Sequence, residues 1–585
     1  MKDGWRSYHQ EQKLSLQIRA ILENYPDGSQ ILKELIQNAD DAEATTVRFV
    51  LSKKRFSTTS LPDKRMDIHQ GPALYAFNNA QFTEEDFDNI TKLSDSSKME
   101  DMQKTGKFGL GFCSVYHITD LPSFVSASKI CIFDPHGEYL PEGNKGIQND
   151  FLENKAVALA YPSLFEPFKL FDFTGTRSYP STMFRLPLRT KKSVISDKIY
   201  KEEDILNLFK QIEEEGSSLL LFLKHVEEIE LYVWDDTNLK LTYSLKIDNP
   251  AKVRDVRRGA DNQSLSQLQE RKEEKPTFIN YEMNIRINSK ATEKWRICNS
   301  IGNYKLIQFS QENSRNRIKL VPWGGVACRV SREKVQGKLF CTLSSPLETK
   351  LPIHINGYFE LTNNRRDLWM GNDLQGKSLI RYQWNTKLFK NLIAFCYVEL
   401  IGKIRKEVTE NDLDYYYSLF PNTQTLDRKW HPLVDKTLKL LIDESAISEK
   451  SHSVSRWNHI MDTIFPGNAP TTVINYLRKY EIFVVFKVPD FVTEQFESLK
   501  FVSPTLVRNT LKKHNSVQLP FEQGLEILDY IGDLSHNLQD IRLVPLMDKT
   551  FGLFSSYSST QYYVAPLEIK KLFDGKKNSF IDEKG

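Results

Sequence analysis

The chain has 585 residues, too many for a single hydrophobic core, so we expect two to four domains. Hydrophobic residues make up 40% of it and charged residues 26%, as in folded soluble proteins. The 79 basic and 76 acidic residues almost cancel, which argues against a nucleic-acid-binding protein. The chain contains no run of about 18 apolar residues, so no membrane span is predicted. The N-terminal stretch is too polar for a signal peptide.

The cysteines are widely spaced, and none forms a CxxC pair or a Cys/His ligand pattern. We therefore expect reduced thiols in a cytosolic-type compartment, which predicts a cytoplasmic location and no structural disulfide or zinc site. The residues concerned are Cys113, Cys131, Cys298, Cys328, Cys341 and Cys396.

The first 190 residues mix helices with strands of the hairpin type. Two helices are expected between residues 10 and 45, separated by Pro26 and Gly28, with Ser29 as an N-cap. A further helix should begin at Thr83, and an apolar helical pattern follows the glycines near residue 108. Alternating or apolar runs predict strands at 45–52, 73–79, 124–134 and 181–189. This order indicates an α+β domain rather than a regular βαβ alternation.

The rest of the chain changes character twice. Residues 191–375 predict a mixed α/β middle domain, in which a helix over 202–223 precedes a strand over 228–234 and further strand-like runs. From residue 376 the patterns become longer and helical, so 376–585 is expected to be mainly helical. The last ten residues complete no element, which indicates a piece of a longer protein.

One predicted helix carries an unusual polar end, in the sequence "ILKELIQNADDA". Glu34, Asn38 and Asp41 lie at positions i, i+4 and i+7, which places them along one side of the helix. The amide oxygen of Asn38 can bind Mg²⁺, and Glu34 can orient or deprotonate a water molecule. An ordinary exposed helix end explains the same residues, and this helix alone leaves both interpretations open.

Two further motifs follow in the chain. The glycine-rich "GKFGLGF" (106–112) leads into an apolar helical pattern, so its backbone N–H groups can converge on an anion. A tight loop packed against a helix is the alternative. Gly175 and Thr176 precede the strand at 181–189 and indicate nothing by themselves. However, the helix with Glu34 and Asn38, the glycine-rich turn and the Gly175–Thr176 pair follow one another in the order and at the spacing of the motifs of one ATP-binding fold.

In that order the motifs resemble the superfamily of DNA gyrase B, the ninety-kilodalton heat-shock chaperone, histidine kinases and MutL. The resemblance implies a Bergerat-type α/β sandwich over residues 1–190 that binds ATP and Mg²⁺. It implies that Glu34 is the general base, Asn38 the Mg²⁺ ligand, Asp41 a polar support and Thr176 a neighbour of the adenine. It also implies phosphate contacts from Gly106, Lys107, Phe108, Gly109, Leu110, Gly111 and Phe112.

Several segments resemble, more narrowly, the repeats of the sacsin family of chaperone-related proteins. The similar segments are 31–42, 71–87, 106–122 and 133–140, and the close likeness covers residues 10–190. A weaker likeness continues through 351–369 and 541–554. This resemblance implies a chaperone or co-chaperone module whose partners are protein clients or other chaperones, with neither nucleic acid nor membrane, and it is compatible with a homo-oligomer.

The sequence departs from the ATPase superfamily where an Asp-x-Gly-x-Gly motif would contact the adenine. Asn78 stands at the position of the Asp, and Ala80 and Phe82 stand at the positions of the glycines. A neutral hydrogen bond is weaker than a charge-assisted one, and the Phe82 ring adds bulk. Two hypotheses follow: a weak ATPase that uses nucleotide binding to change conformation, or a non-enzymatic scaffold that keeps the fold.

A last candidate lies in "NNRRDLW" (363–369). In the heat-shock chaperone, the domain after the ATPase directs an Arg to the γ-phosphate, and by this resemblance Arg365 or Arg366 would do so here. A solvated turn, or an ion pair with Asp367, explains the same residues. A DNA-directed ATPase like MutL or gyrase is disfavoured because the chain shows no basic stripe.

Overall fold

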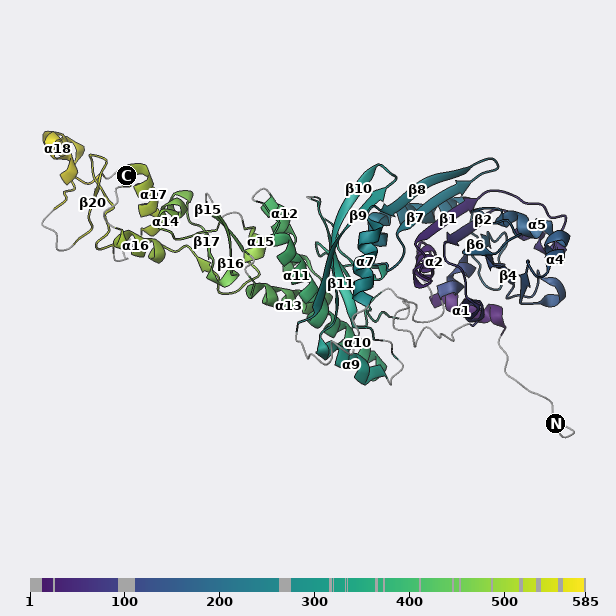
Figure 1. Ribbon diagram of the computed structural model, residues 1–585. Helices are drawn as coiled ribbons and strands as arrows, with labels where there is room; N and C mark the ends of the chain where they lie inside the picture. The colour runs from purple at the N-terminus through teal and green to yellow at the C-terminus, as the bar shows by residue number, and fades with distance from the viewer. Residues whose placement is uncertain are drawn as a thin grey trace. The chain divides into compact units, whose positions relative to one another are not determined.

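The structure is a computed structural model (Figure 1) that divides into two compact units, Met1–Ile401 with Gln424–Val434, and Gly402–Thr423 with Asp435–Gly585. It describes residues 13–24, 27–92, 111–261, 275–314, 318, 320–331, 333, 335–362, 367–371, 374–409, 412–444, 447–451, 454–485, 488–514, 519–532, 538–555 and 561–582. The three-part division into 1–190, 191–375 and 376–585 stays a prediction, and the two units are described separately below.

The first unit contains a 14-stranded mixed sheet in the order β13-β12-β14-β11-β10-β9-β8-β7-β1-β2-β6-β3-β4-β5. Together with the helices around it, this sheet confirms the predicted α+β class. Its strands are β1 Thr46–Ser52, β2 Ala73–Asn78, β3 Ser123–Ala127, β4 Lys129–Phe133, β5 Gly146–Asp150, β6 Tyr179–Pro187, β7 Glu228–Trp234, β8 Leu239–Ile247, β9 Thr277–Ile287, β10 Ala291–Ile301, β11 Trp323–Arg329, β12 Lys338–Cys341, β13 Leu343–Glu348 and β14 His354–Gly357.

The helices of this unit begin and end close to the predicted punctuation. Ser29 occupies the N-cap of the second helix, although its side chain makes no capping bond and its N–H donates to Gln211 Oε1 at 3.1 Å. Thr83 and Asp86 form a complete capping box. The helices are α1 Leu14–Asn24, α2 Gln30–Asp41, α3 Glu84–Asn89, α4 Lys155–Ala160, α5 Pro162–Phe165, α6 Glu202–Glu215, α7 Pro250–Asp261, α9 Tyr304–Ser314, α10 Lys377–Leu388 and α11 Ala394–Arg405.

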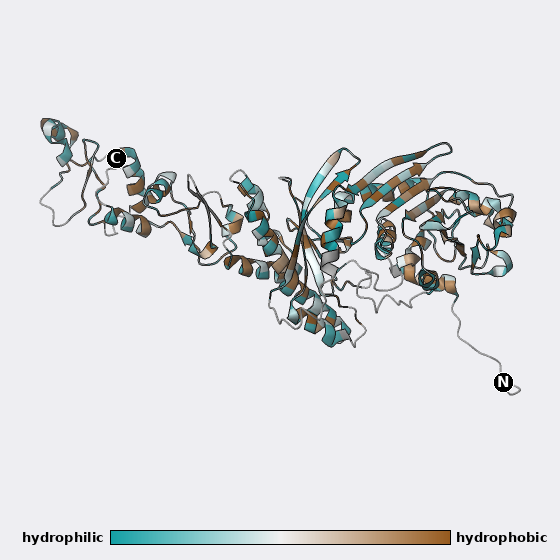
Figure 2. Cartoon of the chain, in the orientation of Figure 1, coloured by the Kyte–Doolittle hydropathy of each residue, from teal (hydrophilic) through white to brown (hydrophobic). Residues whose placement is uncertain are grey.

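Side chains alternate between the two faces of the sheet, and Figure 2 shows hydrophobic and hydrophilic residues following one another along its long strands. Leu74 and Ala76 of β2 pack in one core with Ile31, Leu32 and Ile36 of α2. The opposite face carries a second core, whose members include Ala73, Tyr75 and Phe77 of the same strand together with Leu164 and Phe168. The helix with the unusual polar end therefore covers one defined face of the sheet.

One parallel strand pair joins the two halves of the sheet. β1 pairs with β7 in parallel from Thr46 opposite Glu228 to Ser52 opposite Trp234, whereas β1 pairs with β2 antiparallel. The strands β2 to β6 lie on one side of this pair, and β8 to β14 lie on the other. A parallel pair needs a long crossover, and here the chain between β1 and β7 includes the whole set β2 to β6.

Two features differ from the sequence-based prediction. The strand expected over 124–134 is a hairpin of β3 and β4, because the chain reverses at Ala127, which has a φ of 52°. The residue is small but not glycine, so no ordinary turn signal marks it. The long antiparallel strands β8, β9 and β10 were not predicted, since their charged exposed faces interrupt the apolar alternation.

The second unit is built of helices with short two-stranded pairings, and its core lies among α14, α16 and α17. Val473, Leu477, Val507 and Ile527 are fully buried there. Its elements are α12 Leu413–Ser418, α13 His431–Ile442, β15 Ile447–Ser451, β16 Val454–Asn458, β17 Ile464–Phe465, α14 Thr471–Lys479, α15 Asp490–Thr493, β18 Lys500–Phe501, α16 Pro504–Lys513, α17 Phe521–Ile531, β19 Val544–Pro545, β20 Phe551–Gly552 and α18 Leu567–Leu572.

Two further features of the fold are the state of the cysteines and the hydropathy of the helices. All six cysteines are free thiols. Among the helices of the described ranges, none has both the length and the apolar character that a membrane crossing requires.

Candidate functional site

The polar end of α2 presents Glu34 and Asn38 on the side of the helix nearest the glycine motif. Glu34 is 4% exposed, and one of its carboxylate oxygens accepts a hydrogen bond of 3.1 Å from Gln30 Nε2. Asn38, one turn later, is half-buried. Asp41 is the last residue of the helix and is also half-buried. A buried carboxylate and a half-buried carboxamide therefore share one face of α2.

Gly111, the last glycine of the glycine motif, lies next to these two side chains. A Cβ added at Gly111 would lie 2.5 Å from Glu34 Oε2 and 3.9 Å from Asn38 Nδ2, so any larger residue would require the Glu34 carboxylate to shift. Gly111 begins the 3₁₀ helix η3, Gly111–His117, and Phe112 follows it into the core. The remaining predicted phosphate contacts, Gly106, Lys107, Phe108, Gly109 and Leu110, lie outside the described residues.

Replacing Gly111 by Ala tests this contact between the two motifs. We expect Gly111→Ala to lower the free energy of unfolding by about 1–3 kcal/mol, because the new methyl group overlaps the Glu34 carboxylate. Shortening that carboxylate should relieve the overlap, so Glu34→Ala and Gly111→Ala combined should cost less than the sum of the two single changes. Urea denaturation of the four proteins of this cycle measures the coupling, and strict additivity would contradict the contact.

A second polar group lies at the end of strands β2, β6 and β3. Asn78 and Thr182 are directly opposite each other in the β2–β6 pairing, and Asn78 accepts a hydrogen bond of 3.0 Å from the N–H of Ala80. The Thr182 hydroxyl donates to the carbonyl of Ala80 at 2.8 Å and lies 2.9 Å from Ser126 Oγ. The carboxamide of Asn78 is thus engaged with its own turn.

The Phe82 ring points into a packed aromatic cluster on the face of the sheet that α2 covers. Its centroid lies 5.4 Å from Phe87, 5.3 Å from Phe124 and 6.1 Å from Phe184. Phe184 in turn lies 5.6 Å from Phe112, which follows Gly111. The aromatic cluster, defined as these five rings, contains Phe82, whose N–H donates to Ser126 Oγ of the polar group at 3.0 Å, and Phe112, the residue after Gly111.

The remaining predicted site residues are Thr176, Arg365 and Arg366. Thr176 is exposed in the loop before β6, and its hydroxyl lies 2.9 Å from the hydroxyl of Thr174. Arg365 and Arg366 lie outside the described residues. Thr182 is the threonine that faces Asn78, and the alternation of β6 is the signal that identifies it: Thr182, Phe184 and Leu186 share one face.

Two charged residues of α2 that sequence reasoning passed over are buried. Lys33 is 6% exposed, and its ammonium lies 2.9 Å from Glu215 Oε1 and 2.8 Å from Ser344 Oγ. Lys338 lies 3.5 Å from the other oxygen of Glu215. Burial lowers the pKa of Lys33 and outweighs the opposing charge of Glu215. This group ties α2 to the end of α6 and to the start of β13.

Asp40 is the second residue of this kind. It is 1% exposed, and its carboxylate accepts hydrogen bonds from the backbone N–H groups of Lys224, His225 and Val226 at 3.0, 2.7 and 2.9 Å. These residues directly precede β7. The two neighbouring aspartates of α2 therefore differ, since Asp40 anchors the strand that joins the sheet halves and Asp41 does not share these bonds.

Comparison with known proteins identifies a domain within this chain. Residues 11–246 match the family model of the Sacsin domain. The chain contains a sacsin-type domain. It is also 30% identical over 619 aligned positions to Sacsin of Homo sapiens, an alignment that covers 96% of this chain and 13% of that protein. The chain therefore spans about one eighth of the length of this relative.

The sacsin-type domain includes α2, the Gly111 contact and every strand from β1 to β7, and ends within β8. The predicted resemblance to sacsin-family repeats is thus confirmed. The signature segment 133–140 has a structural basis, because the buried carboxylate of Asp134 accepts from the N–H groups of Gly137, Tyr139 and Leu140 at 3.0, 2.6 and 3.0 Å. The similarity to the ATPase superfamily stays a prediction.

Proposed function

We propose that this chain is a chaperone or co-chaperone module in which the sacsin-type domain is of the Bergerat type and binds Mg²⁺ and ATP on the face of α2. The observation that carries the proposal is the contact of Gly111 with Glu34 and Asn38. Two motifs 70 residues apart meet at a place where any larger residue would displace the carboxylate. A scaffold has no need of a carboxylate, a carboxamide and a glycine at one such corner.

The residues present fit a magnesium-bound triphosphate on the chemistry of their donors. Asn38 would hold Mg²⁺ through its amide oxygen, and backbone N–H groups at the start of η3 would receive phosphate oxygens. Glu34, the proposed catalytic residue, would orient a water molecule and accept its proton. When bound, Mg²⁺ would neutralise charge on the phosphates. In this proposal Asp41 would be a support residue, and Lys107 and Arg365 or Arg366 would contact the phosphates.

The Lys33 group supports a link between this site and the rest of the unit. Lys33 precedes Glu34 in α2, and its ammonium contacts Glu215 and Ser344. A change in the position of α2 would therefore reach β13 through buried contacts. In this proposal the nucleotide state regulates contact with protein clients or other chaperones in the cytoplasm, with neither nucleic acid nor membrane as a partner, in a monomer or a homo-oligomer.

One specific observation favours a second candidate function, a scaffold or interaction repeat without nucleotide. The aromatic cluster adjoins the polar group at Asn78, because the Phe82 N–H donates to Ser126 Oγ at 3.0 Å, and the rings of Phe82, Phe124 and Phe184 are packed against one another. A purine at Asn78 would have to share the adjoining space with the Phe82 ring. Binding of ATP therefore requires that the ring moves or that the base lies elsewhere.

Calorimetry with Mg²⁺ and ATP separates the two functions. We expect heat and a thermal shift at millimolar ATP, slow release of phosphate, and retention of binding but at least a hundredfold lower turnover in Glu34→Ala. Glu85→Ala, in an exposed carboxylate of α3, is the matched control and should change neither. Absence of heat and of a thermal shift establishes the scaffold, whereas turnover that persists in Glu34→Ala removes the assigned base.

A further inference from the structure

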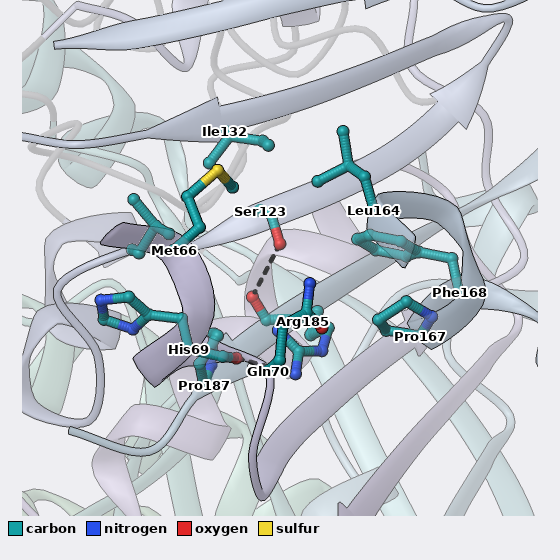
Figure 3. A pocket seen from close by; sticks show the side chains of 11 residues that line it. Met66, His69, Gln70, Ser123, Ile132, Leu164, Pro167, Phe168, Arg185 and Pro187 are labelled. Carbon is teal, nitrogen blue, oxygen red and sulfur yellow. Dashed lines mark hydrogen bonds between the residues drawn. The ribbon is translucent and has the colours of Figure 1, made fainter. Parts of the chain in front are cut away.

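A small cavity with a few polar groups lies on the face of the sheet opposite α2. Its volume is about 20 Å³, enough for one water molecule or one small ion. Figure 3 shows Gln70 and Arg185 side by side below Ser123, with Met66 and His69 on one side and Leu164, Pro167 and Phe168 on the other. Most of the lining is apolar, so the few polar groups decide what the cavity can hold.

Arg185 is the charged group of this cavity. It stands between Phe184 and Leu186 on β6 and therefore points to the other face of the sheet from those residues, where it is 4% exposed. Its guanidinium donates to Tyr75 Oη at 3.1 Å and to the carbonyls of His69 and Gly71 at 3.0 and 3.1 Å. Within the described part of the chain, all these acceptors are uncharged.

A buried guanidinium with only neutral partners is costly, because a buried charge needs a counter-charge. Arg189, nearby in sequence, illustrates the usual solution, since it is equally buried and binds the carboxylate of Asp120 at 2.7 Å. Arg185 also acts on His69, a neighbour in the cavity. Burial and the charges of Arg185, Arg189 and Lys191 together lower the pKa of His69 to about 4, against the opposing carboxylate of Asp120.

Two uncharged polar side chains border the same cavity and have weak partners. Gln70 is 5% exposed, its Nε2 donates to the carbonyl of Ser163 at only 3.4 Å, and its Oε1 has no partner among the described residues. The Ser123 hydroxyl donates to the carbonyl of Arg185 at 3.4 Å. The Ser123 hydroxyl can reorient, since a hydroxyl rotates freely, whereas the Gln70 amide nitrogen is held by the Ser163 carbonyl.

We propose that this cavity binds one small monovalent anion of chloride size, with Arg185 as its counter-charge and Ser123 as an additional donor. A water molecule would satisfy hydrogen bonds there but would leave the guanidinium without a counter-charge. An anion does both, and the apolar side chains of Met66, Leu164 and Phe168 shield it from solvent. The site is independent of the proposed nucleotide function.

Chloride-35 relaxation of the full chain tests the proposal. We expect the linewidth of chloride to increase in proportion to protein concentration and to return to the buffer value when bromide is added in excess. Arg185→Gln should remove at least nine-tenths of this broadening, and Ser123→Ala, which changes the fold least, should reduce it severalfold. Arg65→Gln, in a half-exposed arginine next to Asp63, is the matched control and should leave it unchanged.

A second measurement keeps the proposal testable if Arg185→Gln does not fold. Crystals soaked in bromide should show one anomalous peak in the cavity, within hydrogen-bond distance of the Arg185 guanidinium. A water molecule there without anomalous signal, or chloride broadening that is equal in wild type and Ser123→Ala, overturns the proposal.

Discussion

The variant Asp40→Ala should unfold with a free energy about 3 kcal/mol below that of the wild type, whereas Asp41→Ala, one residue further on, should change it far less. Asp40 accepts three backbone N–H groups from residues 224 to 226 and is almost completely buried. Hydrogen bonds to a charged group contribute about 1.5–3 kcal/mol each, and truncation leaves the donors without an acceptor. Water that enters the space of the lost side chain recovers part of this loss.

The position of these bonds makes the effect larger than a local one. The N–H groups of Glu227 and Glu228 donate to the carbonyl of Thr45 at 2.8 and 3.1 Å, directly after the residues that Asp40 holds. Asp40 therefore fixes the entry to β7, the strand through which β1 connects the two halves of the sheet. Asp40→Asn keeps one acceptor oxygen, that of the carboxamide, but loses the charge. Its free energy of unfolding should lie between those of Asp40→Ala and the wild type.

Urea denaturation of Asp40→Ala, Asp40→Asn and Asp41→Ala provides the measurement. Hydrogen exchange at residues 224 to 234 shows where stability is lost, and we expect faster exchange there in Asp40→Ala than in Asp41→Ala. Equal effects of the two alanine variants would mean that the three bonds do not hold the strand.

The N-terminal part of the fold could be predicted from the sequence because its signals are local. Gly28 lies between α1 and α2, Thr83 and Asp86 cap α3, and β-branched alternation marks β1. The joint between β1 and β7 could not be predicted, because parallel pairing of strands 180 residues apart has no local signal. A single apolar run at 124–134 likewise gave no sign of the reversal at Ala127.

The candidate site shows the same division. Glu34 and Asn38 share one side of α2, as their helical spacing predicts, whereas the approach of Gly111 to them is a tertiary contact between segments more than 70 residues apart. The sequence did not identify Thr182 as the partner of Asn78. Only the register between strands β2 and β6 places these two residues opposite each other. The direction of the Phe82 ring depends on Phe124 and Phe184, which come from other strands, so the sequence left it open. Asp40 and Asp41 are chemically identical, and only the tertiary contacts distinguish them.

The other large effect is expected for Arg189→Met, which should lower the free energy of unfolding by about 3–5 kcal/mol. Arg189 is 2% exposed and donates to Asp120 Oδ1 at 3.0 and 2.7 Å, and to the carbonyls of Tyr116 and His117 at 2.7 and 3.0 Å. Methionine fills much of the volume but leaves the Asp120 carboxylate buried without its cation. Arg65→Met, at a half-exposed ion pair with Asp63, is the control and should have little effect.

The pH dependence of this difference distinguishes a lost charge pair from lost packing. Burial alone raises the pKa of Asp120, but contacts with His136 and Arg189 outweigh it and lower the pKa to about 2, below the ordinary value of 3.8. The stability that the ionised carboxylate contributes in the wild type is therefore complete above about pH 4 and is lost between pH 4 and 2. In Arg189→Met the contacts with His136 and Ser193 remain but those with the guanidinium are lost, so Asp120 should take up a proton at a higher pH than in the wild type. The difference in unfolding free energy between wild type and Arg189→Met should then shrink as the pH falls from 7 to 4, and Asp120→Asn should restore part of the stability of Arg189→Met at pH 7. A difference that is constant over this range, measured by urea denaturation, would assign the loss to packing and carbonyl contacts instead of the charge.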